Sequence, residues 1–267
     1  MNYLFWNTNK NKNINTLLVD LIKSYNCEVL ALAEYEDDVI DLQKKLDIQN
    51  INLYHVPSIM CKKITLLTKY NKEKIKHGPE SKRYTIKIIP HDNLHQIILA
   101  LVHLPSKMHS DFGMITEELR SLVKDIEEVE KNNNNCNTII TGDFNLNPFE
   151  DSLVSASGLH SLNNEEISLK KKRVILGREY RYFYNPMWKL WGKQDFPGGT
   201  YYYNSSYALN YFWNIFDQVV IRPDLISNFN QNNLKIITEI NGVNLLNTNG
   251  IPNRDISDHL PLFFEIK

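Results

Sequence analysis

Short runs of apolar residues recur along the whole chain and set its expected secondary structure. Each run is of strand length, and most are rich in β-branched or aromatic residues. We therefore expect β-strands at Tyr3–Trp6, Val29–Ala33, Ile64–Thr68, Tyr84–Ile89, Gln96–His103, Thr138–Thr141, Gln218–Ile221, Lys235–Ile240 and Pro261–Ile266.

Apolar residues spaced three and four apart predict a few helices between these strands. The pattern indicates helices over Ile14–Tyr25 and Met114–Lys131, and a shorter one over Glu150–Ala156 that is entered through Pro148. Many strands and few helices fit economically into two sheets that are each covered by helices. The sequence therefore predicts an α/β fold, with one domain over residues 1–267 and an elaborated loop region at about 169–210.

Charge and cysteine usage narrow the class of protein. The formal net charge of −1 means that an anionic substrate must be bound by a local patch or a metal. The three cysteines, Cys27, Cys61 and Cys136, lack metal-like spacing and favour a reducing compartment. No secretory signal is visible, and no apolar segment approaches the roughly 20 residues that span a membrane. These features predict a cytoplasmic protein with no membrane partner and no obligate protein partner.

One predicted strand ends at Gly142-Asp143-Phe144-Asn145. Side chains two residues apart leave a strand on the same face, so the carboxylate of Asp143 and the amide of Asn145 can converge on one ligand. A polar turn before the helix at Pro148 would explain the same residues without any function.

The last predicted strand is preceded by Ser257-Asp258-His259. A His with a carboxylate partner is the usual general base, and a neighbouring Asp can bind a hard cation through oxygen. A capping turn with an exposed His is the alternative for this segment.

Four more polar residues lie in or at the ends of apolar runs. Asn7, Glu34 and His103 each end such a run, and Asp217 lies within Trp213–Ile221. Burying a charge without a partner is costly, so each residue needs a counter-charge, a metal or solvent. Any one of them is explained by ordinary structural polarity, whereas the whole set indicates a functional site.

The chain resembles the endonuclease/exonuclease/phosphatase superfamily in an ordered set of residues: Asn7, Glu34, His103, Gly142-Asp143-Phe144-Asn145, Asp217 and Ser257-Asp258-His259. The resemblance runs from residue 3 to residue 266. It implies a four-layer αββα sandwich of two mixed β-sheets flanked by helices, with the site at the mouth between the sheets.

The resemblance also implies a metal site. Glu34 would be the principal ligand of Mg²⁺ or Mn²⁺, helped by Asn7 and Asp258. All three offer hard oxygen atoms, which these ions prefer.

The remaining roles follow from the same resemblance. His259, oriented by Asp217, would be the general base or the electrostatic partner of the phosphate. Asp143 would position the attacking water, and Asn145 would donate to a phosphate oxygen. His103 would act as a leaving-group acid or a phosphate donor. The sequence departs from many members at Gln218, where a Tyr or His commonly follows the Asp.

Cations and aromatics alternate from Lys170, Lys171, Lys172 and Arg173 to Tyr184. This mixture suits an unpaired or distorted nucleic acid, although a solvated strand face would look the same. Trp188, within 184–188, and the segment 197–203 would line a pocket beside the site or form a packed loop. Arg83 is a candidate phosphate contact or an edge-strand arginine.

These patterns favour a metal-dependent nuclease or phosphodiesterase that acts on DNA or RNA. A second hypothesis is a phosphatase or phosphodiesterase of a small phosphorylated molecule. A third is a binding protein that keeps the fold without catalysis. The complete set from Asn7 to His259 weighs against the third hypothesis.

Overall fold

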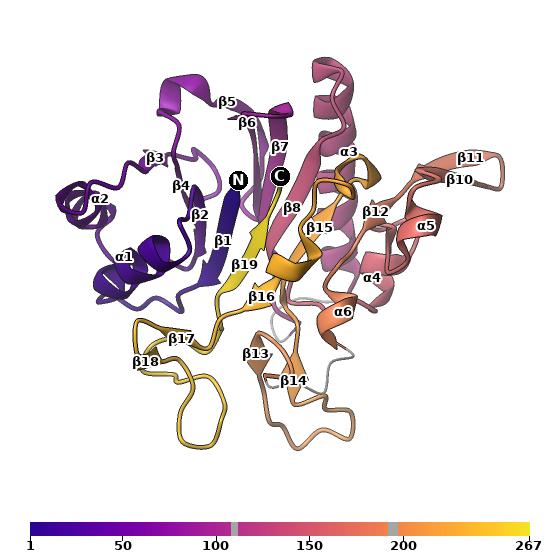
Figure 1. Cartoon of the computed structure of the whole chain (residues 1–267). Helices are drawn as coiled ribbons and strands as arrows, with labels where there is room; N and C mark the ends of the chain where they lie inside the picture. The colour runs from indigo at the N-terminus through magenta and orange to yellow at the C-terminus, as the bar shows by residue number, and fades with distance from the viewer. Residues whose placement is uncertain (108–111, 192–196) are drawn as a thin grey trace.

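Two large mixed β-sheets lie face to face, with helices on both outer sides (Figure 1). The computed structural model describes residues 1–107, 112–191 and 197–267. One sheet has the order β16 (Lys235–Ile236), β19 (Leu262–Glu265), β1 (Asn2–Asn7), β2 (Val29–Ala33), β4 (Ile64–Thr68), β3 (Tyr54–Val56). The other has the order β5 (Lys76–Glu80), β6 (Tyr84–His91), β7 (His95–His103), β8 (Thr138–Asp143), β15 (Asp217–Ile221), β12 (Phe183–Tyr184), β9 (Ser161–Leu162).

The alternation of side chains along each strand divides the core into three buried layers. In β1, Tyr3 and Phe5 face the other sheet, whereas Leu4 and Trp6 pack under helices. The six-stranded sheet is covered by α1 (Asn15–Ser24) and α2 (Val39–Ile48), and the seven-stranded sheet by α3 (Phe112–Asn133) and α4 (Asp151–Val154). The expected four-layer αββα sandwich is therefore confirmed.

Two of the predicted elements need correction beyond small shifts of their ends. The stretch Lys235–Ile240 is not one strand, because only its first two residues pair with β19. Its end, β17 (Glu239–Ile240), forms a hairpin with β18 (Val243–Asn244) through Asn241-Gly242, both with positive φ. Helix α4 begins at Asp151 and is not entered through Pro148.

Several helices and strands were not predicted from the sequence. Helix α2 is capped by Asp38, which accepts a hydrogen bond from the Ile40 N–H, and it buries only Leu42 and Leu46. Two buried positions give too weak a periodicity for recognition. The region 169–210 is more ordered than a loop, although its residues 192–196 lie outside the described chain. The further elements are α5 (Glu165–Ser168), β10 (Lys172–Ile175), β11 (Arg178–Arg181), α6 (Trp188–Trp191), β13 (Tyr201–Tyr202), β14 (Trp213–Asn214) and short 3₁₀ turns at Lys72–Lys74, Pro223–Leu225 and Gln231–Asn233.

Across the three described stretches, no helix is long and apolar enough to cross a membrane. The three cysteines are free thiols.

A buried ion pair stabilises one end of the seven-stranded sheet. The Lys87 side chain is fully buried and pairs with Glu80, whose side chain is 9% exposed. The same carboxylate accepts hydrogen bonds from the Thr85 hydroxyl at 2.8 Å and from the backbone N–H groups of Ile59 and Met60 at 2.9 and 3.0 Å. Burial alone would raise the pKa of Glu80, but the Lys87 and backbone hydrogen bonds lower it to about 2.

Glu80→Gln should therefore destabilise the fold at neutral pH by about 3 kcal/mol, because the Lys87 charge stays buried without its partner. The folded pKa lies below the ordinary value of 4.5, so the wild-type advantage is present above that value and is lost as pH falls from 4.5 toward 2. Urea unfolding of both proteins at neutral pH and at pH 3 measures it. The exposed Glu73→Gln serves as control, and an advantage that is independent of pH would contradict this account.

Candidate active site

The inward-facing alternation of both sheets continues into polar residues at one end of the sandwich. In β1 the inward series Tyr3 and Phe5 ends at Asn7. In the other sheet, Asp143 at the end of β8 pairs in register with the last residue of β7 and the first residue of β15. These two residues are His103 and Asp217. The period of two that builds the core therefore also assembles the polar centre.

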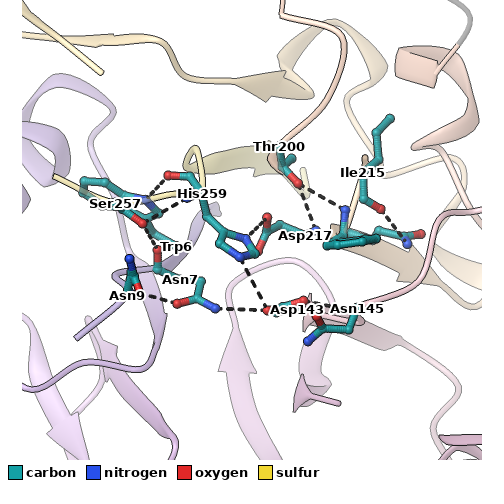
Figure 2. A network of polar contacts seen from close by, with 12 residues as sticks. Trp6, Asn7, Asn9, Asp143, Asn145, Thr200, Ile215, Asp217, Ser257 and His259 are labelled. Carbon is teal, nitrogen blue, oxygen red and sulfur yellow. Dashed lines mark hydrogen bonds and ion pairs between the residues drawn. The ribbon is translucent and has the colours of Figure 1, made fainter. Parts of the chain in front are cut away.

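The carboxylate of Asp143 lies at the middle of this centre and is 1% exposed. Its Oδ2 accepts a hydrogen bond from Asn7 Nδ2 in the opposite sheet at 3.0 Å, and its Oδ1 accepts one from the Asn145 N–H at 2.9 Å (Figure 2). The Nε2 atoms of His103 and His259 lie 3.8 and 3.9 Å from the same Oδ2. This carboxylate therefore joins groups from both sheets.

The neighbours of Asp143 in sequence have backbones that suit this position. Gly142 has φ of 151°, and a Cβ there would lie 2.0 Å from the Val102 carbonyl oxygen, so only glycine fits. Asn145 has φ of 50°, a conformation that Asn tolerates well. Its Nδ2 donates to the Leu104 carbonyl at 2.9 Å, which leaves the second N–H of the amide for another acceptor.

Hydrogen bonds fix both the ring and the backbone of His259. Its Nδ1 lies 2.7 Å from Asp217 Oδ2, the geometry of a strong hydrogen bond. Ser257 Oγ donates to the Asn7 carbonyl at 2.7 Å and accepts from the His259 N–H at 3.1 Å. Trp6 Nε1 donates to the His259 carbonyl at 2.9 Å. The Ser257-Asp258-His259 segment is therefore anchored to the end of β1 (Figure 2).

The two histidines of the centre have opposite protonation states. Burial alone would lower the pKa of His259, but the carboxylates of Asp217, Asp143 and Asp258 raise it to about 10. Burial lowers the pKa of His103 to about 4. Burial raises the pKa of Asp143, and the His259 charge opposes that rise. At neutral pH His259 is an imidazolium and His103 is neutral.

Glu34 follows β2 in a strained backbone conformation. Its φ of 50° is in the left-handed region, which costs a residue with a Cβ roughly 1–2 kcal/mol. Three hydrogen bonds impose it: Glu34 N–H to the Lys63 carbonyl at 3.0 Å, Lys10 N–H to the Glu34 carbonyl at 2.9 Å, and Thr8 Oγ1 to that carbonyl at 3.1 Å. Strain imposed in this way is typical of functional positions.

Glu34 and Asn7 fit a divalent cation. The Glu34 carboxylate is 3.4 Å from His103 Nε2 and 3.9 Å from Lys10 Nζ, longer than the roughly 2.7–2.9 Å of a charge-assisted hydrogen bond. Asn7 Oδ1 accepts the Asn9 N–H at 3.1 Å and keeps a second lone pair. Both residues offer hard oxygen atoms, the ligands that Mg²⁺ and Mn²⁺ prefer. These oxygens have lone pairs free for a metal ion at the mouth of the site.

A second set of possible ligands is less suitable. Ligand atoms of Asp143, Asp217 and His259 lie within 4.8 Å of one another. However, His259 is protonated and its Nδ1 is committed to Asp217, and a metal ligand must be deprotonated. The half-buried Asp258 acts on the imidazolium through its charge.

The predicted substrate contacts lie in three different places. Arg83 lies beside the centre, because its carbonyl accepts the His103 N–H at 2.8 Å and its charge contributes to the low pKa of His103. The run Lys170–Arg173 lies at the other end of the sheet, where Lys171 pairs with Asp224 at 2.5 Å, beyond the far end of β15. Trp188 lines a separate cavity.

Little or nothing in the sequence indicated that Thr200 and Tyr201 lie next to the centre. Thr200 Oγ1 accepts the N–H groups of Phe216 and Asp217 at 3.2 and 3.1 Å and so fixes the start of β15. The ring centroid of Tyr201 lies 4.7 Å from that of His259. The backbones of the two residues also pair in an isolated antiparallel β-bridge. The segment 197–203 suggested a pocket beside the site, but nothing in it indicated the role of Thr200.

The model of the Endonuclease/Exonuclease/phosphatase family matches residues 4–259. The chain belongs to this family, as its motifs predicted. A search of curated proteins gave no match.

Solved structures with the same fold cover the whole chain. A D. rerio TDP2 complexed with a single strand DNA product is 15% identical over 100% of this chain and 98% of its own, with a TM-score of 0.58. The 3'-5' exonuclease NExo of Neisseria meningitidis is 13% identical over 100% of both chains, with a TM-score of 0.58. An AP endonuclease of Archaeoglobus fulgidus is 12% identical over 100% and 99%, with a TM-score of 0.57. At these identities the likeness supports the fold.

Asp217→Asn should lower the pKa of His259 from about 10 toward its ordinary value of 6.5, because it removes the strongest charge that favours the imidazolium. An NMR titration of the histidine Cε1–H signals, in EDTA, measures this change. Asp224→Asn, near the other end of β15, is the matched control and should leave the titration unchanged. A wild-type His259 that titrates near 6.5 would refute the assigned charge state.

Proposed function

We propose that the chain is a phosphoester hydrolase that cleaves nucleic acid with Mg²⁺ or Mn²⁺, and that residues 1–267 form one catalytic domain. The observation that carries the proposal is the buried carboxylate of Asp143, bonded to Asn7 of the opposite sheet and flanked by His103 and His259. The Glu34 carboxylate, which has unused hydrogen-bonding capacity, lies beside His103. Family membership supports the same reaction class.

In this mechanism Asp143 orients the attacking water and accepts its proton, a role that its raised pKa favours. The imidazolium of His259 donates from Nε2 to a phosphate oxygen and stabilises the charge that grows in the transition state. Asp217 keeps the ring oriented through Nδ1. Of the two roles expected for His259, its charge state supports electrostatic partner over general base.

Glu34 and Asn7, with Asp258, would hold the metal ion, which as a Lewis acid would stabilise negative charge on the phosphoryl oxygens. Neutral His103 donates a ring N–H hydrogen bond to the phosphate or to the leaving oxygen. Because its low pKa leaves no imidazolium at neutral pH, the leaving oxygen takes its proton from solvent water. The remaining amide N–H of Asn145 is a further phosphate donor.

Aromatic rings next to His259 support a nucleic-acid substrate. Phe216, Tyr201 and Tyr203 form a stacked row with centroids 5.2 and 6.5 Å apart, and Tyr201 touches His259. Such rows bind unpaired bases, and the charge of Arg83 acts on the same centre. Two of the structural neighbours agree with such a substrate: the TDP2 complex holds a single strand DNA product, and NExo is a 3'-5' exonuclease. The basic run Lys170–Arg173 would contact only a longer strand.

The catalytic assignment is tested with single-stranded DNA, duplex DNA, RNA and a bis-aryl phosphate in Mg²⁺ or Mn²⁺. His259→Ala should lower kcat by roughly 10²–10³. Glu34→Gln should raise the metal concentration required for half-maximal rate. Glu36→Gln, an exposed carboxylate on the same turn, should behave as wild type.

EDTA-sensitive cleavage of a polymer that is lost in His259→Ala would establish the nuclease. Turnover of the aryl ester alone would support the catalytic assignment of the centre but would make a small phosphoester the substrate. A normal rate in His259→Ala, or a metal titration unchanged by Glu34→Gln, would remove the corresponding role.

Tyr203→Leu should raise the KM for single-stranded DNA by roughly five- to a hundredfold, because one stacked base is worth about 1–3 kcal/mol. The variant should leave bis-aryl phosphate turnover unchanged, since Tyr203 reaches His259 only through Tyr201. Tyr54→Leu, on the edge strand β3 of the six-stranded sheet, is the control. Equal KM values for Tyr203→Leu and wild type would exclude this platform.

A further inference from the structure

Gln218, the second residue of β15, has a buried side-chain amide that the proposed mechanism does not use. Its Nε2 donates to the Leu146 carbonyl at 2.6 Å and to the Ile215 carbonyl at 3.0 Å. Its Oε1 accepts a hydrogen bond from Asn185 Nδ2 at 2.8 Å. Both N–H groups of the amide are therefore used, and this one side chain joins the turn after β8, the segment before β15 and the residue after β12.

The neighbours of this amide determine its orientation. A rotation of the Gln218 amide by 180° would place Oε1 against the two carbonyl oxygens and its N–H groups against the Asn185 donor. Asn185 is itself fixed, because its Oδ1 accepts the Met187 N–H at 3.0 Å. Buried polar groups need partners, so this position requires a side chain with two donors and an acceptor. Tyr and neutral His, which commonly follow this Asp in the family, offer one donor each.

The Leu146 carbonyl belongs to the residue after Asn145, the proposed phosphate donor. On the N-terminal side, the Asn145 N–H is held by Asp143 Oδ1 at 2.9 Å. On the C-terminal side, the Leu146 carbonyl is held by Gln218. Between these two attachments Asn145 has a φ of 50°, and its side-chain amide donates to the Leu104 carbonyl at 2.9 Å. The direction of the second amide N–H of Asn145 therefore depends on both attachments.

We propose that Gln218 is a positioning residue for phosphoester cleavage: through the Leu146 carbonyl it keeps the free amide N–H of Asn145 directed at the phosphate. The inference rests on the proposed function, because it takes Asn145 as a phosphate donor. Gln218 and Asp217 are consecutive in β15, so their side chains lie on opposite faces of the strand. Asp217 orients His259 from one face, and Gln218 holds the turn of Asn145 from the other.

The kinetic test is a double-mutant cycle with Gln218→Met, Asn145→Gly and the variant that carries both, on single-stranded DNA in Mg²⁺. Met keeps the length of the side chain and removes the amide, and Gly permits the φ of residue 145. Asn145→Gly should lower kcat by roughly 10²–10³, the effect of losing one donor to the transition state. Gln218→Met should lower kcat by roughly tenfold or more at nearly unchanged KM, because the affected bond acts in the transition state. The double variant should be no slower than Asn145→Gly, since residues that act as one unit are not additive.

Two further variants separate positioning from stability. Asn185→Ala removes the donor to Gln218 and leaves Gln218 in place, so it should lower kcat by a smaller factor, and only when Asn145 is present. This milder change decides the question if Gln218→Met does not fold. Thr138→Val, at the far end of β8, removes a buried hydrogen bond of 2.6 Å to Glu130 and should leave kcat unchanged.

A second readout needs no turnover and is independent of the proposed reaction. Hydrogen exchange of the Asn145 side-chain amide, followed by NMR in EDTA, should be roughly tenfold faster in Gln218→Met than in wild type, because the turn opens more often. The exchange rate should be unchanged in Thr138→Val.

An Asn145→Gly protein with the wild-type rate would remove the proposed role of Asn145, and this inference with it. A slow Asn145→Gly beside a normal Gln218→Met would overturn only the inference. The same holds for a double variant that is slower by the product of the two single factors, or for an Asn145 amide whose exchange is unchanged by Gln218→Met.

Discussion

Burial of the Asp143 carboxylate is the constraint on which the rest of the centre depends. At 1% exposure this charge has almost no solvent, so it must be stabilised by neighbours. Asn7 reaches it from the opposite sheet, the Asn145 N–H reaches it from its own turn, and the His259 imidazolium supplies the counter-charge. The two sheets therefore have to meet with the ends of β1 and β8 side by side, which determines where every other polar group lies.

Much of this centre was predictable because it extends a local pattern. Asn7, His103 and Asp143 each end an apolar run, so the sequence places them at strand ends. Both faces of these strands are buried, so only the fold shows that the three side chains point inward. The αββα sandwich follows from the same runs with the family motifs. The charge state of His259 was beyond reach, because it results from carboxylates on separate segments that only the folded chain brings together.

The regions that escaped prediction are those in which pairing is set at long range. The basic run and Trp188 follow each other in sequence with similar composition, yet neither belongs to the centre. The positions of the basic run and of Trp188 depend on the pairing of Tyr184 in β12 with Ile221 in β15. Ile221 ends β15, whereas Asp217 begins it. Local propensity contains no information about such a register. The strained backbone of Glu34 was equally hidden, because partners in two distant segments, at Thr8–Lys10 and at Lys63, impose it.

The pairing of β1 with β19 has a consequence for the newly made protein. Trp6 bonds the His259 carbonyl, a contact that spans 253 positions of the chain. Until the ribosome has made His259 and β19, one edge of β1 has no partner, and the carboxylates of Asp143 and Asp217 face each other without the imidazolium. A nascent chain that lacks these residues therefore carries no complete centre, and the centre forms together with β19.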